Sequence, residues 1–391
     1  MSKHIATTTR ASCFILISLL VGCQTTDNIQ MDEPIPFVFR SLNLRHKRVN
    51  GDRDWDLTSP EAKYESSRRI VRARLPEGIL YKDSNPSFEI SALNATIFND
   101  GETVLLEGEV KLQQLGGQKV LIIGDRLRWT PDKSLMVIDQ RPQALNSDSR
   151  LVAKRAEFQQ QTHDLLLIGP TQLERWEEIR TPKQKPITII RGRDGVWNLD
   201  SGKLVTQGPI MGTREPKGED SIQTITSSGL RGNTKAGYID LINPVGVNLP
   251  SENGNLQAKT TRWDFKREEL ESNKPFTGQL EKSSYSGDAF KVDLSGTTVQ
   301  IPKTCKFKQP GEQLFADQCF FNWTTEKIKA IGNVVLKRDS NDQTTRSERL
   351  EGHVGEDGRV TFSSPGSQVL SELTLKESTP QNAGQVRENS P

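Results

Sequence analysis

The chain is poor in the side chains that carry most metal and redox chemistry. Its 391 residues include 4 histidines and 4 cysteines. The motifs His-Glu-x-x-His, Gly-x-Ser-x-Gly, Gly-x-x-x-x-Gly-Lys and Cys-x-x-Cys do not occur. Three histidines, His46, His163 and His353, lie in polar stretches without a ligand partner at helical or strand spacing, which favours solvent-exposed side chains. We therefore expect no enzyme, no catalytic residue, no metal site and no cofactor.

An excess of charge of either sign is also missing. Lysine and arginine total 52 and aspartate and glutamate total 50, which gives a formal net charge of +2. Loss of an N-terminal signal of 22 residues would remove Lys3 and Arg10 and leave 50 charges of each sign. Because no block of basic residues remains, nucleic acid and anionic membrane surfaces are poor candidate partners.

Long hydrophobic runs are confined to the N-terminus. Lys3 and Arg10 precede an apolar stretch, Ala11–Val21, which is about half the length that crosses a bilayer and is typical of a signal peptide. The sequence Leu20-Val21-Gly22-Cys23 then matches a bacterial lipoprotein signal. We expect lipidation of Cys23 and a periplasmic protein anchored to the inner membrane, with outer-membrane anchoring as the other possibility. An ordinary signal peptide that is cut nearby would leave Cys23 unmodified.

The other cysteines fit an oxidising compartment. Cys13 lies in the signal peptide, which leaves Cys305 and Cys319 with each other. A disulfide between them would close a loop of about fifteen residues and contribute about 3 kcal/mol. Two free buried thiols, or half of a metal site, are the alternatives.

One pattern recurs about every thirty residues. An alternating strand is followed by a polar turn and then by a second strand, with the clearest copies starting at Trp55, Phe88, Val120 and Leu151. These starts are 33, 32 and 31 residues apart, a spacing typical of stacked hairpins.

Alternation within the repeats predicts strands with one apolar and one polar face. Val104, Leu106, Val110 and Leu112 share a face, with Gly108 in line between them. The same spacing relates Val120, Ile122, Leu127 and Trp129, and likewise the pairs Leu135 with Val137, Leu151 with Ala153, and Leu165 with Leu167. No long helical period appears, so we predict an all-β protein of antiparallel strands.

The repeats and the segments between them predict a domain order. It is a signal peptide at 1–22, a flexible linker at 23–36, a β unit at 37–176, a charged connection with prolines at 177–190, a more divergent β unit at 191–374 and a disordered tail at 375–391.

Three copies of the pattern carry a family resemblance. Ala330-Ile331-Gly332-Asn333-Val334-Val335-Leu336 is similar to the repeats of OstA-type domains in the lipopolysaccharide transport bridge. Trp55-Asp56-Leu57, which leads into Ala62, and Glu107-Gly108-Glu109-Val110 resemble LptC, the membrane-anchored periplasmic component of the lipopolysaccharide exporter. The resemblance covers residues 37–175 well and 190–370 more loosely.

The resemblance implies an open twisted antiparallel β-jelly roll, here two such units in tandem, whose apolar inner face holds the acyl chains of lipopolysaccharide or a related glycolipid. One sheet edge would receive lipid from the permease subunits of an inner-membrane ABC transporter, and the other would pass it to a periplasmic bridge or outer-membrane partner by strand addition. The candidate groove residues are Ile90, Ile97, Val104, Leu106, Val110, Leu112, Val120, Ile122, Leu127, Trp129, Val137, Phe158, Leu165 and Leu167.

Two departures from the family leave alternatives open. Better-known members have an uncleaved transmembrane helix and one domain, so the second half here could replace a separate bridge subunit. A scaffolding lipoprotein that binds only proteins through its sheet edges is the main alternative. Small inward residues such as Ala95, Gly108 and Ala153 leave room for lipid, whereas large ones would fill the interior. A hydrolase acting on envelope glycans would need convergent carboxylates, which the sequence does not display.

Overall fold

The computed structural model describes residues 37–181, 183–215, 222–353 and 359–373. They all belong to one compact unit. Antiparallel strands dominate this part of the chain, with four short 3-10 turns at Asn99–Gly101, Pro131–Lys133, Pro250–Glu252 and Asp339–Asn341. The predicted signal peptide, linker and C-terminal tail, and Cys23 with them, lie outside the described residues.

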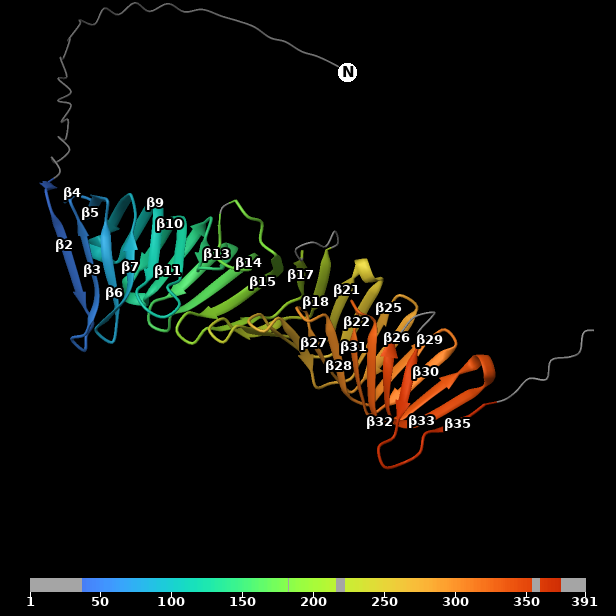
Figure 1. Ribbon diagram of the computed structural model, residues 1–391. Coiled ribbons are helices and arrows are strands. Elements are labelled where there is room, and N and C mark those ends of the chain that lie inside the picture. The colour runs from blue at the N-terminus through green and yellow to red at the C-terminus, as the bar shows by residue number, and fades with distance from the viewer. Residues whose placement is uncertain (1–36, 182, 216–221, 354–358, 374–391) are drawn as a thin grey trace, which may run out of the picture. The chain divides into compact units, whose positions relative to one another are not determined.

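The strands follow one another closely in sequence (Figure 1). The first fourteen are β1 (Phe37–Phe39), β2 (Leu42–Lys47), β3 (Arg53–Ser59), β4 (Glu61–Glu65), β5 (Ile70–Arg74), β6 (Glu77–Lys82), β7 (Asn85–Ser91), β8 (Asn94–Phe98), β9 (Thr103–Gln114), β10 (Leu121–Thr130), β11 (Leu135–Gln140), β12 (Gln143–Leu145), β13 (Ser149–Gln159) and β14 (Asp164–Arg175). Next come β15 (Thr188–Asn198), β16 (Lys203–Thr206), β17 (Ile210–Arg214), β18 (Gln223–Ser227), β19 (Leu230–Asn233), β20 (Tyr238–Leu241), β21 (Val245–Leu249), β22 (Gly254–Ala258), β23 (Thr261–Asp264), β24 (Glu269–Ser272) and β25 (Phe276–Leu280). The last are β26 (Ser283–Gly287), β27 (Ala289–Asp293), β28 (Thr298–Lys303), β29 (Cys305–Gln309), β30 (Glu312–Ala316), β31 (Gln318–Asn322), β32 (Lys327–Arg338), β33 (Gln343–His353), β34 (Val360–Ser363) and β35 (Leu370–Glu372).

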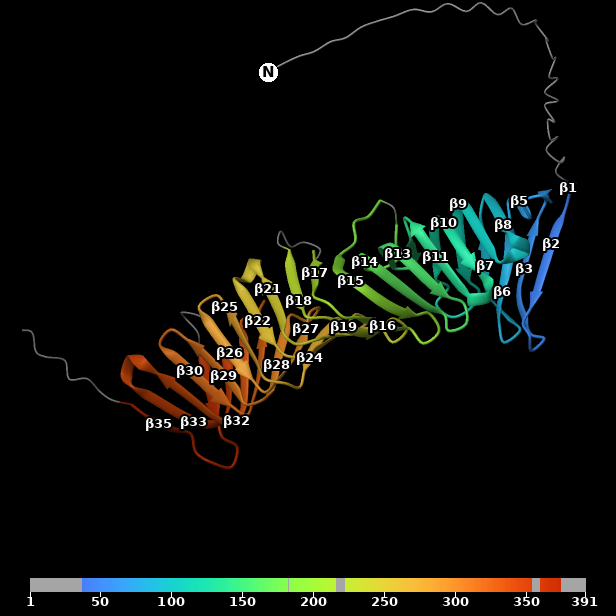
Figure 2. The same ribbon diagram turned by 180° about the vertical axis from the view of Figure 1, so that it is seen from behind.

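These strands form two antiparallel ladders that face each other. The first ladder pairs β2, β3, β6, β7, β9, β10, β12, β13, β14, β15, β17, β18, β21, β22, β25, β26, β29, β30, β32, β33 and β35 in that order. The second ladder pairs β1, β4, β5, β8, β9, β10, β11, β13, β14, β15, β16, β19, β20, β23, β24, β27, β28, β31, β32, β33 and β34. Neighbouring strands of each ladder lie side by side in both views (Figures 1 and 2).

The chain crosses between the ladders at corners, and the recurring glycine of the repeat makes some of them. Gly108 in β9, Gly169 in β14 and Gly332 in β32 have φ of +76°, +83° and +77°. The strand register shifts beside each of them, which is a β-bulge. Because glycine adopts positive φ without a steric penalty, these long strands bend there and continue in the other ladder. The predicted all-β fold and its open jelly-roll form are confirmed.

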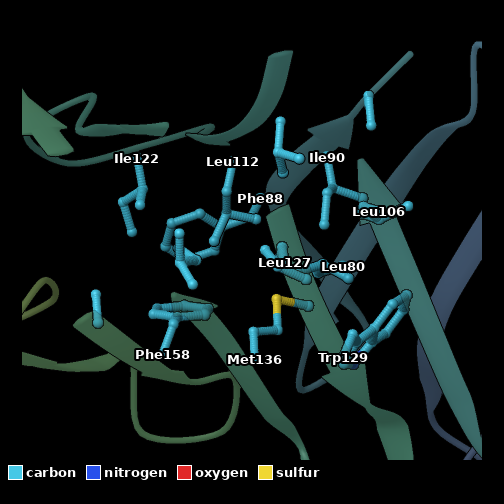
Figure 3. Packing of buried hydrophobic residues seen from close by; sticks show 14 of the residues in the cluster. Leu80, Phe88, Ile90, Leu106, Leu112, Ile122, Leu127, Trp129, Met136 and Phe158 are labelled. Atoms are coloured by element: carbon cyan, nitrogen blue, oxygen red, sulfur yellow. The ribbon is translucent and has the colours of Figure 1, made fainter. Parts of the chain in front are cut away.

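Apolar side chains fill the space between the ladders in two clusters. The first runs from Trp55 to Leu199, and Figure 3 shows part of its packing. The second runs from Ile190 to Leu350. The strands themselves continue across the predicted connection, because β14 and β15 pair from Asp164↔Asn198 to Arg175↔Thr188. The ladders therefore run through both proposed units, and the two apolar clusters are bridged by Leu173 and Leu204, which pack against both.

Val137 is an exception to the predicted inward face. It is half-buried, whereas its neighbours Met136 and Ile138 are 0% and 1% exposed. Four apolar residues stand in a row from Leu135 to Ile138, so alternation alone did not determine which pair faces inward. Met136 pairs with the buried Trp129, so Met136 and Ile138 face inward and Val137 faces outward. The prediction that Val137 lies on the inner face was wrong.

The corner near the C-terminal end carries a disulfide. Cys305 in β29 and Cys319 in β31 are bonded, with their Cα atoms 5.8 Å apart. Both side chains are buried in the second cluster, and the bond ties one ladder to the other.

Candidate functional site

The interior of the N-terminal half is a packed core. All predicted groove residues except Val137 belong to the first cluster, with exposures from 0% to 5%. Leu80, Phe88 and Met136 pack among them, as Figure 3 shows. The rings of Phe88 and Phe158 meet edge to face with centroids 4.9 Å apart. As the chain stands, these residues fill the space that a lipid would need.

A cavity lies where the first cluster gives way to the second. It has a volume of ≈ 190 Å³, and its walls come from β12 to β17, β19, β20 and the turns beside them. Buried apolar side chains line it from both clusters: Ala144, Leu151, Leu167 and Trp197 from the first, and Ile190, Ile210, Leu230 and Ile239 from the second. An apolar floor of this composition suits an apolar chain.

Two glycines of β15 keep this space open. Gly192 and Gly195 both line the cavity. A Cβ atom at Gly192 would approach Cγ2 of Ile210 to 3.1 Å, which is tighter than ordinary contact. Between them Asp194 has φ of +38°, and its Oδ1 accepts a hydrogen bond of 2.7 Å from the amide of Gly169. The corner of β14 and β15 is thus fixed by a polar contact, while Gly192 and Gly195 add no side chain to the cavity wall.

The mouth of the cavity is polar, and its cations already have partners. Nε of Arg175 lies 3.6 Å from Oδ2 of Asp148, and its guanidinium carbon lies 4.8 Å from the ring centroid of Phe265. Nζ of Lys266 donates to the carbonyl oxygen of Lys235 at 3.0 Å. The site is therefore amphipathic, with an apolar floor and a charged rim, but the rim offers no ready anion pocket.

Trp197, whose side chain forms part of the cavity wall, is hydrogen-bonded to Thr234 in the turn between β19 and β20. Nε1 of Trp197 donates to Oγ1 of Thr234 at 3.1 Å, so the indole is satisfied although the ring is buried. Two other buried indoles of the first cluster, those of Trp55 and Trp129, have no hydrogen-bond partner for Nε1. They contact each other edge to face with centroids 5.0 Å apart.

His163 departs from the expectation of an exposed histidine. It is 3% exposed and packs against the rings of Phe88 and Phe158. Its Nδ1 lies 2.7 Å from Oδ1 of Asp200, whose Oδ2 is 2.5 Å from Nζ of Lys82. Burial lowers the pKa of His163, against the raising effect of Asp200. Burial opposes ionisation of Asp200, but the hydrogen bonds from His163 and Lys82 leave its pKa below the ordinary value.

Sequence reasoning missed the cavity and this partly buried cluster of His163, Asp200 and Lys82. Paired glycines within a strand, as at Gly192 and Gly195, were a usable signal for an open wall. Within the described parts of the chain, no group of three or more histidine, cysteine, aspartate or glutamate side chains could hold a metal ion. The same residues contain no helix long and apolar enough to span a bilayer.

The fold and the site define a class: an open β-jelly roll with an apolar interior. A family model described as "Lipopolysaccharide-assembly, LptC-related" matches residues 11–140, about a third of the chain. Over these residues the chain is LptC-like, and the resemblance seen in the repeats is confirmed. A search of curated proteins finds no match. Every residue that lines the cavity lies beyond the matched segment.

Proposed function

We propose that the protein is a periplasmic component of a lipopolysaccharide transport route and carries the acyl chains of the glycolipid between its two ladders. The match to the LptC-related family supports the process. The apolar cavity between the two clusters is the observation that carries lipid binding, because it is the place where an apolar chain fits without displacing packed side chains. Each buried methylene would contribute about 0.8 kcal/mol.

The predicted groove residues would extend this site toward the N-terminus. Residues from Ile90 to Leu167 form one continuous apolar interior that ends at the cavity, where Leu167 belongs to both. A lipid that passes along the roll would contact these side chains in turn. The second cluster would continue the path, so that one chain covers the distance that two bridge subunits would otherwise cover.

The two ends of the ladders are the proposed partner sites. β1 and β2 are paired on one side only, and Phe37 and Val38 on β1 are 61% and 60% exposed. β35 at the other end is likewise paired on one side, with Leu370 52% exposed. Unpaired strand edges accept further strands. We assign the first edge to inner-membrane permease subunits and the second to a bridge or outer-membrane partner.

Lipidation of Cys23 would hold the first edge near the membrane. The C23A variant should appear in the soluble periplasmic fraction, whereas the unchanged protein should stay with membranes. A variant that remains fully membrane-bound would contradict the proposed anchor.

Neighbouring residues of β17 provide a matched test of lipid binding. Ile210 lines the cavity and is 4% exposed, and Met211 points outward and is 47% exposed. A photo-crosslinking amino acid at position 210 should capture lipopolysaccharide in cells, and the same group at position 211 should not. Equal capture at both positions, or none at either, would refute the lipid-binding interior and favour the scaffold.

A scaffolding lipoprotein is the second candidate function, because the N-terminal interior is filled by the protein's own side chains. Such a protein would bind only proteins, through the same sheet edges. Crosslinks to protein partners at Phe37 or Leu370 without any lipid at position 210 would be its signature.

A further inference from the structure

Turns of the two ladders meet along the side of the roll opposite the corners. We call these contacts the seam: Asp54 with Gln160, Lys82 with Asp200 and His163, and Gln118 with Thr234. In each, a residue from the first ladder's side contacts residues from turns of the second. The partners of each pair are between 106 and 118 residues apart, apart from the local pair of Asp200 and His163.

The middle of the seam is an ion cluster. Lys82, beside the turn that joins β6 to β7, reaches Asp200 in the turn that joins β15 to β16. Asp200 also accepts from His163 in the turn between β13 and β14. Nε2 of His163 and Oε1 of Gln160 are buried and have no hydrogen-bond partner, which leaves two polar atoms of the seam unsatisfied while it is shut. The other charged group that affects His163 is Asp164.

Hydrogen bonds of amide and hydroxyl side chains extend the seam on both sides of this cluster. Nε2 of Gln160 donates to the carbonyl oxygen and to Oδ1 of Asp54, at 3.1 and 3.2 Å. Arg48 donates to the same carboxylate, so the buried Asp54 is also held from its own ladder. The hydroxyl of Thr234 donates to Oε1 of Gln118 at 2.9 Å.

The seam ends beyond the cavity. Its last crossings are the contact of Arg175 with the ring of Phe265 and an ion pair of 3.7 Å between Arg214 and Glu268. Past Glu268, the hydrogen bonds and ion pairs of the described side chains no longer join turns of one ladder to turns of the other. Inner-face residues there, such as Phe307 and Phe321, are only partly buried.

We propose that the seam is a lateral gate, which holds the N-terminal interior shut and must part before acyl chains can enter it and pass on to the cavity. This inference rests on the proposed lipid binding. Three features support it: the interior behind the seam is filled, the interior beyond its end is partly exposed, and the cavity lies between them. Each of these contacts is made by a side chain and not by the strand pairing, so the seam can part while the ladder hydrogen bonds stay intact.

A covalent lock tests the gate. The double variant K82C/D200C, joined by a short bismaleimide, would hold the two turns together. Photo-crosslinkers at Ile122, behind the seam, and at Ile210, in the cavity, report lipid separately. We expect lipopolysaccharide at both positions in the unjoined double variant. Joining should lower capture at position 122 at least fivefold and, because lipid from the permease edge reaches the cavity through this interior, should lower capture at position 210 as well.

Controls separate this proposal from the lipid-binding proposal. The single variants K82C and D200C, treated with the same reagent, should behave like untreated protein and exclude effects of modification alone. Unchanged capture at position 122 after joining would overturn the gate and leave lipid binding intact. Capture at position 210 alone in the unjoined protein would also overturn the gate. No capture at either position would refute lipid binding, and the gate with it.

Discussion

Filling the cavity should stabilise the protein and impair lipid binding at the same time. Ala144 on β12 lines the cavity and is 4% exposed. Replacement by leucine adds three carbon atoms, which at about 0.8 kcal/mol for each buried methylene gives about 2.4 kcal/mol. Ordering the longer side chain costs about 0.5–1 kcal/mol. Since the cavity of ≈ 190 Å³ can hold these atoms, we expect the free energy of unfolding to rise by about 1.5 kcal/mol.

A matched substitution in the packed core should have the opposite effect. Ala95 on β8 is 2% exposed and pairs with Leu106, far from the cavity lining. Leucine at this position has no free space and should destabilise the protein by about 1–3 kcal/mol through overpacking. Urea unfolding of A144L and A95L, followed by tryptophan fluorescence, measures both changes.

Lipid capture from position 210 completes the test. The A144L variant should capture several-fold less lipopolysaccharide than the unchanged protein, because leucine occupies part of the space. If A144L is destabilised as much as A95L, the cavity is not available space and the reasoning fails. If A144L is stabilised but captures lipid normally, the cavity exists and is not the lipid site.

The remaining predictions concern stability. Replacing both Cys305 and Cys319 by serine should lower the free energy of unfolding by about 3 kcal/mol, and a reductant should affect only the unchanged protein. Because burial lowers the pKa of His163, the free energy of unfolding should be highest above the ordinary histidine pKa of about 6.5 and should fall at lower pH. The melting temperature of H163Q should depend less on pH than that of the unchanged protein between about pH 8 and pH 5. L127A should cost about 3 kcal/mol and V137A less than about 1 kcal/mol, and equal losses would contradict the assigned faces.

The sequence pattern predicted the strands because every second side chain of a strand lies on the same, buried face. The alternation in β9 predicted the buried faces of Val104, Leu106, Val110 and Leu112 correctly. It failed at Val137, where consecutive apolar residues removed the alternation and a long-range pairing decided the face. The local pattern therefore sufficed to predict that strands form, whereas the pairing of β11 with β10 decided which face of β11 is buried.

The cavity and the seam depend on contacts that local patterns do not contain. A cavity forms where side chains from different strands do not fill the space between them. The walls of this cavity include residues from Ala144 on β12 to Ile239 on β20, which lie on many different strands. The seam joins residues far apart in sequence, such as Lys82 and Asp200, which are 118 positions apart. His163 looked solvent-exposed because its neighbours in sequence are polar, yet the rings that bury it come from other strands.

The strength of the seam decides whether lipid can open it. Its hydrogen bonds contribute about 1 kcal/mol each, and the ion pair of Lys82 and Asp200 contributes no more than that because both side chains are partly exposed. The five crossings, from Asp54–Gln160 to Arg214–Glu268, total about 5 kcal/mol at most, which burial of about six methylenes would offset. Parting the ladders without lipid would also expose the apolar core to water, at a far greater cost. The seam should therefore stay shut in the free protein and open only as acyl chains cover the separated faces.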